Sequence, residues 1–121
     1  MHQLLADYLE CMERLYNDIK QALDGLPEQA LDWSPAPDVN SIAVLVAHAA
    51  GSGRMYIGEK AGGTLMSRDR DAEFRTHGRS AADLVALLDE NLNLARTVFA
   101  NLTLEELERT AGTTRSGTGY S

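Results

Sequence analysis

The chain has 121 residues, of which 44% are hydrophobic, and this fits one globular domain with a single core. Its formal net charge is −7, and its basic side chains do not cluster on a predicted helix face, so we expect no nucleic-acid partner. No stretch approaches the roughly 20 uncharged apolar residues that a bilayer crossing needs, and no signal peptide is recognisable, so we expect a cytoplasmic protein with no membrane partner.

The first predicted helix runs from about Gln3 to Asp24. Gly25 and Pro27 end it, because glycine readily adopts the left-handed conformation and proline cannot continue the hydrogen-bond ladder. Cys11 is the single cysteine; it excludes an internal disulfide, suits a reducing compartment and is expected to pack as a small hydrophobe. Spacings of three and four place the expected core face at Leu5, Tyr8, Met12, Leu15, Ile19, Ala22 and Leu26.

A second long helix is predicted after a proline-containing connection. A short helical turn is expected at Pro27–Leu31, where proline suits the first helical position. Asn40 or Ser41 caps the long helix, and the pair Gly62 and Gly63 ends it. The same spacing of three and four places its expected inner face at Leu45, His48, Ser52, Met55 and Glu59.

The next segment, from Gly62 to Arg79, is polar and has no apolar period. At about 3.3 Å per residue it can run back along a helix about 30 Å long, so we expect the second and third helices to be parallel. Ser80 with Asp83 resembles a capping box that begins the third helix. Its expected core stripe consists of Leu84, Leu87 or Leu88, Asn91, Ala95, Val98 and Leu102.

The end of the sequence divides the chain into two parts. Thr103 with Glu106 is expected to cap a further short helix, and residues 110–121 have the composition of a linker. We therefore expect an incomplete helical bundle domain over residues 1–109 and a polar tail rich in Gly, Thr and Ser over 110–121. Three apolar stripes without a fourth leave a groove, and we expect a homodimer or a larger homo-oligomer to cover it.

The run from Leu26 to His48 contains Trp33-x-Pro and Asn40-Ser-Ile, and residues 68–74 read Arg-Asp-Arg-Asp-Ala-Glu-Phe. These features resemble the damage-inducible, DinB-like superfamily over residues 1 to about 109. The resemblance implies an all-α, up-down-down-up four-helix bundle, of which three long helices are present here and the fourth is missing or supplied by a partner. It also implies a metal-dependent enzyme of the thiol-dependent S-transferase, isomerase or hydrolase type, with a small-molecule substrate and a low-molecular-weight thiol as cosubstrate.

The resemblance further implies a divalent metal, zinc or nickel, held by three histidines. One lies late in the second helix, where His48 matches it, and the other two lie four residues apart on the fourth helix and have no counterpart here. We therefore expect no metal in a three-ligand site of this chain, and we keep a non-catalytic bundle that acts as an oligomerisation or binding module as the alternative function. From its residue type alone, a histidine on an apolar helix face is more often a core residue than a ligand. On either reading we expect His48 to be buried beside Leu45 and Ser52.

The other polar and aromatic candidates are expected to be structural. The charged residues of 68–73 could hold a substrate carboxylate, but alternating charges usually pair with each other. Trp33 is expected to plug an end of the bundle, and the small residues at 47–53 are expected to serve close packing more than a pocket. His2 and His77 are expected to be solvated.

Overall fold

The computed structural model describes residues 1–103, 105, 106 and 108, and this part of the chain is all-helical, as expected. No helix within it is long and apolar enough to span a bilayer. The elements are α1 (Gln3–Leu23), α2 (Glu28–Asp32), α3 (Ile42–Gly53), the π-helix η1 (Arg54–Ala61), α4 (Arg70–Phe74) and α5 (Ala81–Asn101).

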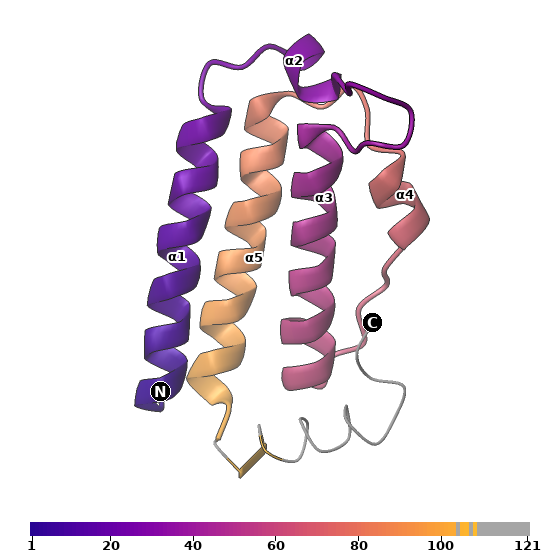
Figure 1. Ribbon diagram of the computed structural model, residues 1–121. Helices are drawn as coiled ribbons and strands as arrows, with labels where there is room; N and C mark the ends of the chain where they lie inside the picture. The colour runs from indigo at the N-terminus through magenta and orange to yellow at the C-terminus, as the bar shows by residue number, and fades with distance from the viewer. Residues whose placement is uncertain (104, 107, 109–121) are drawn as a thin grey trace.

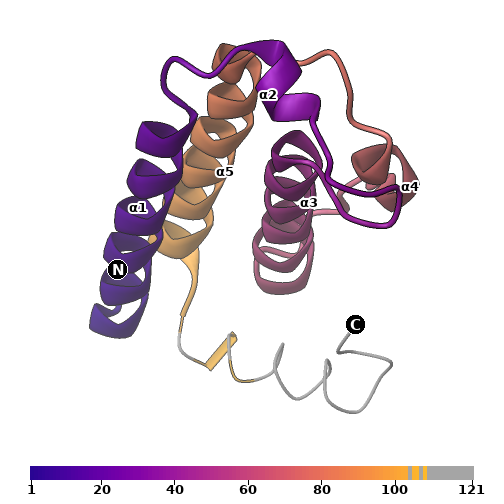
Figure 2. The same cartoon turned by 45° about the horizontal axis from the view of Figure 1, so that its top comes forward.

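The three long helical segments lie side by side, with α5 between α1 and α3 (Figure 1). The helices α3 and α5 run in the same direction and α1 runs opposite to both, as the tilted view also shows (Figure 2). The connection between η1 and α5 returns along the outer side of α3, so the expected long crossover is present. It is not unstructured, however, because it contains α4, whose first turn is capped by the Asp69 side chain accepting from the Ala72 N–H at 3.0 Å.

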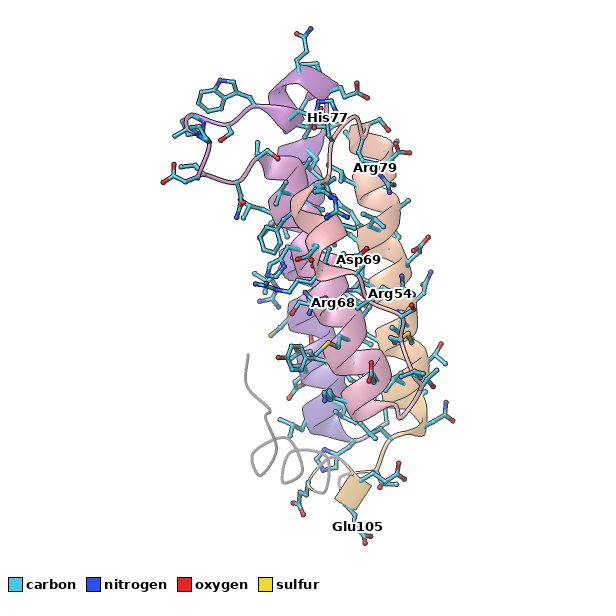
Figure 3. The ribbon with its side chains drawn as sticks, turned by 90° about the vertical axis from the view of Figure 1, so that its right-hand side faces the viewer. Arg54, Arg68, Asp69, His77, Arg79 and Glu105 are labelled. Carbon is cyan, nitrogen blue, oxygen red and sulfur yellow. The ribbon has the colours of Figure 1, made fainter. Side chains whose placement is uncertain are left out.

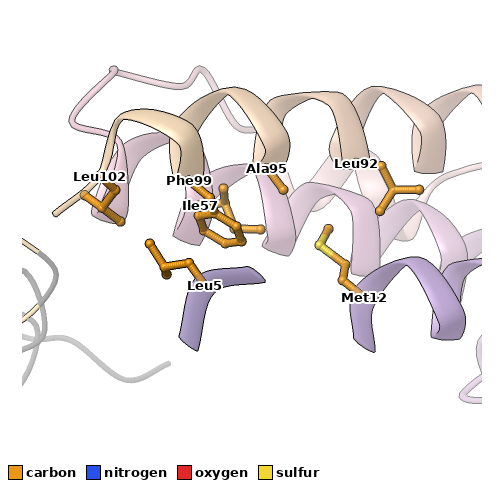
Figure 4. Packing of buried hydrophobic residues seen from close by; sticks show 7 residues of the cluster. All are labelled: Leu5, Met12, Ile57, Leu92, Ala95, Phe99 and Leu102. Atoms are coloured by element: carbon orange, nitrogen blue, oxygen red, sulfur yellow. The ribbon is translucent and has the colours of Figure 1, made fainter. Parts of the chain in front are cut away.

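The core consists of two clusters, and α5 contributes to both. Figure 4 shows the first cluster, in which side chains of α1, η1 and α5 meet. Fully burying one leucine contributes roughly 1.5–3 kcal/mol, so these clusters supply most of the driving force for folding. Their buried members are Leu5, Met12, Ile57, Leu92, Ala95, Phe99 and Leu102 in the first, and Leu23, Leu31, Ala43, Val46, Leu84 and Leu88 in the second.

The core face of α1 differs from the expected one. Leu5 and Met12 are buried, but Tyr8 is exposed and Leu15 is 62% exposed. Cys11 is also exposed, so the expectation that it packs as a hydrophobe is wrong. The reason is that α1 packs mainly against α5, with a smaller contribution from η1, so part of its wide apolar stripe stays uncovered.

The inner face of α3 is also rotated from the expected one. Leu45 is 54% exposed, whereas the alanines at 43, 47 and 50 and Val46 are buried. Small side chains let two helix backbones approach closely, so α3 turns its alanine face toward the core rather than its larger residues. His48 consequently lies beside the core and not in it.

The predicted helix ends are largely confirmed. The Ser41 side chain accepts from the Val44 N–H at 3.1 Å, and Ser80 with Asp83 forms the predicted capping box. Gly25 has a φ of +76°, as its place after α1 requires. The Glu106 N–H donates to Thr103 Oγ1 at 3.1 Å, as expected, whereas the predicted tail at 110–121 lies outside the described residues.

Two local features differ from the prediction. The helix that begins at Ile42 extends to Gly62 as expected, but from Arg54 to Ala61 it is the π-helix η1, and π-helical segments are rare and often lie at functional sites. Trp33 is 67% exposed, so it does not plug the bundle. Its neighbour Leu31 does so instead, since it is fully buried in the second cluster.

Candidate functional site

Three side chains from α3, the crossover and α4 meet on the outer side of α3. His48 Nδ1 lies 3.1 Å from Glu73 Oε1, and Arg68 donates to both oxygens of the same carboxylate, from Nε and Nη2, at 2.9 Å each. The third nitrogen of Arg68, Nη1, lies 3.7 Å from the sulfur of Met55 in η1. The Glu73 carboxylate is therefore the centre of a polar cluster that ties the crossover to the long helix.

The cluster is largely shielded from solvent. The side chains of Glu73 and Arg68 are only 11% and 15% exposed, whereas that of His48 is 36% exposed. Burial by itself raises the pKa of Glu73, but the hydrogen bonds and charges of Arg68 and His48 outweigh it and hold that pKa below its usual value. The hydrogen bond to Glu73 raises the pKa of Arg68. Glu73 and Arg68 are thus both ionised, and each satisfies the hydrogen-bonding groups of the other.

A glycine makes room for the Glu73 carboxylate against α3. A Cβ at Gly51 would lie 1.7 Å from Glu73 Oε2, a separation that no side chain can adopt without moving the carboxylate. Glycine inside a helix costs about 1 kcal/mol relative to alanine, so the close approach of Glu73 explains a residue that helix propensity disfavours. Gly51 thus serves close packing, as expected for the small residues of this helix, but Ala47, Ala50 and Gly51 also line a cavity.

The orientation of the His48 ring follows from its partners. An ionised carboxylate only accepts hydrogen bonds, so in the contact with Glu73 the proton sits on Nδ1 of His48. Arg68 Nη2 is farther from Nδ1, at 3.5 Å, and already donates to Glu73. The ring also packs against Phe74, with centroids 5.0 Å apart. In the neutral ring Nε2 therefore keeps its lone pair, which is the state that binds a metal or accepts a proton.

The expected burial of His48 beside Leu45 and Ser52 is wrong. Its side chain is one-third exposed and faces α4 and the crossover, because the alanine face of α3 occupies the core. The expected role of His48 as a metal ligand stays a prediction.

The other polar candidates do not join this cluster. His77 lies 3.6 Å from Asp32 with its side chain 82% exposed, as expected, and His2 is exposed and caps α1 by accepting from the Leu4 N–H. Glu59 accepts from the Met66 N–H at 3.4 Å near the end of η1. Across the described residues, no three His, Cys, Asp or Glu side chains are grouped so that they could hold a metal ion.

Some charged residues of the crossover pair with each other, as expected. Besides Arg68 with Glu73, the guanidinium of Arg75 lies 4.0 Å from Asp69, and Arg70 stacks over the ring of Phe74 at 4.9 Å. The sequence therefore predicted the kind of pairing that Arg68 and Glu73 show. It did not predict that His48 is one of their partners, because α4 is a short element without an apolar period.

A family model described as the DinB superfamily matches residues 12–120. No curated protein and no solved structure matches the chain. The matched segment contains α3, the crossover and all three residues of the polar cluster.

Proposed function

The chain belongs to the DinB superfamily, and from this premise we propose that it contributes to a metal-dependent enzyme in which His48 is a ligand through Nε2. The observation that carries the proposal is the contact between His48 Nδ1 and Glu73. Histidines that bind a metal through one nitrogen almost always donate the other N–H to a carboxylate, a carbonyl or water. The contact gives His48 this arrangement.

The roles of the cluster residues follow from its geometry. Glu73 fixes the ring and makes Nε2 a stronger donor of electron density. Arg68 keeps the Glu73 carboxylate ionised and immobile through two hydrogen bonds. Phe74 covers one side of the ring. These residues orient one ligand before any metal arrives, which lowers the entropic cost of binding.

The fit to a metal is partial. His48 matches a ligand supported by a carboxylate, but the described residues do not assemble a set of three ligands. The proposal therefore places the remaining ligands on a segment other than the described ones. A bound zinc or nickel would act as a Lewis acid toward a thiol or water. Transfer from a low-molecular-weight thiol, isomerisation and hydrolysis are the reactions that we propose for such a centre.

Nickel titration followed by NMR tests the proposal on the full chain. Paramagnetic Ni²⁺ is expected to broaden the signals of His48 and of its neighbours first, with weak affinity because one ligand is supplied. His48→Ala removes this broadening, whereas His77→Ala, which changes an exposed histidine of the crossover, retains it. Broadening centred on His77, or unchanged in His48→Ala, would contradict the proposal. Stoichiometric zinc or nickel in the purified protein would contradict the placement of the other ligands elsewhere.

A second candidate function, a module for self-association, is favoured by exposed apolar side chains on two long helices. Leu4, Tyr8 and Leu15 project from α1, and Ile42 and Leu45 project from α3. In a symmetric dimer the same surface serves both subunits, so each stripe of one chain can cover a stripe of the other. We propose a second copy of this chain as the occupant.

A further inference from the structure

A cavity of about 230 Å³ lies beside the polar cluster, between α3, the crossover, α4 and α5. Its polar rim includes Arg54, Arg68, Asp69 and Arg79, which Figure 3 labels on this side of the molecule. Protein pockets that bind drug-sized molecules usually have volumes of roughly 300–1,000 Å³. The cavity therefore suits a molecule of only a few carbon atoms.

The charges around the cavity do not cancel. Glu73 is neutralised by Arg68, and Asp69 caps α4 through the Ala72 N–H and lies near Arg75. Arg54 and Arg79 also line the cavity, and neither forms an ion pair within the part of the chain that the structure describes. Two guanidinium groups thus remain for an anion from outside, although the whole chain has a net charge of −7.

The inner wall of the cavity is apolar. Ala47 and Ala50 of α3, Met66 of the crossover and Leu87 of α5 line it. An inorganic anion would leave these side chains without a partner, whereas a short hydrocarbon chain would be buried by them. Guanidinium groups bind carboxylates through two parallel hydrogen bonds. The wall and the rim therefore favour one molecule with both features.

We propose that the cavity binds a small organic carboxylate, with its anionic end at Arg54 and Arg79 and its short apolar chain against Ala50, Met66 and Leu87. The ion pair of Arg68 and Glu73 forms a wall of this site and excludes a ligand carboxylate from the side of His48. Arg54 is the first residue of η1 and lies at the rim of the cavity. The inference requires no metal, so it stands apart from the proposed metal centre.

Titration of the full chain with sodium butanoate, followed by two-dimensional NMR, tests the inference. Saturable shifts are expected at residues of the cavity. Arg54→Gln and Arg79→Gln are each expected to weaken butanoate about tenfold, because each removes a charge-assisted hydrogen bond. Arg14→Gln is the matched control, since Arg14 is an exposed arginine of α1 that pairs with Glu10. It is expected to leave the affinity unchanged.

Two further ligands test the contribution of the negative charge and that of the apolar chain separately. Butanamide has the same chain without charge and is expected to bind weakly, and inorganic phosphate has charge without a chain and is expected to bind weakly as well. Equal binding of butanamide and butanoate would overturn the role of the arginines, and phosphate binding as tight as that of butanoate would overturn the carboxylate assignment. Absence of saturable shifts, or equal weakening by Arg14→Gln, would overturn the site. His48→Ala is expected to retain butanoate binding, so failure of the metal proposal remains distinguishable.

Discussion

Oε1 of Glu73 lies 3.1 Å from Nδ1 of His48, a residue 25 positions earlier in the chain. The contact joins the short helix of the crossover to the middle of α3. Because Arg68 holds the other side of the same carboxylate, changes at Glu73 are expected to affect both the packing of the crossover and the chemistry of His48.

Glu73→Gln is expected to reduce the free energy of unfolding at neutral pH by roughly 1–3 kcal/mol. The substitution leaves the guanidinium of Arg68, which is largely buried, without its charged partner. Urea unfolding by circular dichroism measures the change. Glu10→Gln, in an exposed pair with Arg14, is the control and is expected to change stability by less than about 1 kcal/mol. Equal stability of Glu73→Gln and the wild type would contradict the role of the cluster.

Acid is expected to weaken the same cluster. The pKa of Glu73 in the folded state lies below its ordinary value of 4.5, so the contribution of this carboxylate to stability is complete above that pH and is lost as the pH falls through the folded pKa. The difference in unfolding free energy between the wild type and Glu73→Gln should therefore shrink in this acidic window. A difference that stays constant with pH would contradict the depressed pKa.

Gly51→Ala is expected to destabilise the protein although alanine is the better helix former. The added Cβ would lie 1.7 Å from Glu73 Oε2, so the carboxylate must move away from α3. Breaking its hydrogen bonds costs more than the gain of about 1 kcal/mol from helix propensity. Ser52→Ala, one residue further on the same helix, is the control. Stabilisation by Gly51→Ala with an unchanged NMR signal for His48 would show that Glu73 does not pack on this glycine.

The sequence predicted the ends of the helices better than their faces. Caps such as Ser41 and Ser80 act within one turn, so their residue types determine the outcome locally. The inner face of α3 depends on how closely α5 approaches, and that distance is a property of the assembled bundle. The sequence singled out His48 as a candidate, but its partner Glu73 lies on a five-residue helix that no periodic pattern marks. The site could therefore be predicted only in part.

Alkaline pH is expected to act through Tyr16, a partly buried tyrosine of α1. Asn91 is fully buried, and its side-chain amide donates to Tyr16 Oη at 2.9 Å. Partial burial raises the pKa of Tyr16 above its ordinary value of 10.0, although this hydrogen bond by itself lowers it. Its contribution to stability is complete below that value and is lost as the pH rises through the folded pKa. Tyr16→Phe should lack this loss, and should cost about 1 kcal/mol at neutral pH because it leaves the Asn91 amide unpaired. Parallel alkaline profiles for both proteins would contradict the assignment.

Sedimentation across a range of micromolar concentrations tests self-association. We expect the wild type to form a dimer or a larger closed oligomer, and Leu15→Glu or Leu45→Glu to shift it to the monomer, since both leucines are exposed in the single chain. Leu65→Glu, at an exposed crossover position, is the control. A well-folded monomer at every concentration would contradict association. Association that none of the helix substitutions disrupts would place the interface elsewhere.

The tautomer of His48 tests the central claim most directly, because the proposed ligand role requires a proton on Nδ1 and a free Nε2. Long-range ¹H–¹⁵N correlation spectra of the neutral ring distinguish the two nitrogens. We predict that His48 is protonated at Nδ1 in the wild type and that Glu73→Gln shifts the population toward the Nε2–H form, whereas His77 keeps the same spectrum in both proteins. A wild-type His48 with its proton on Nε2 would contradict the account, since that nitrogen could then bind no metal.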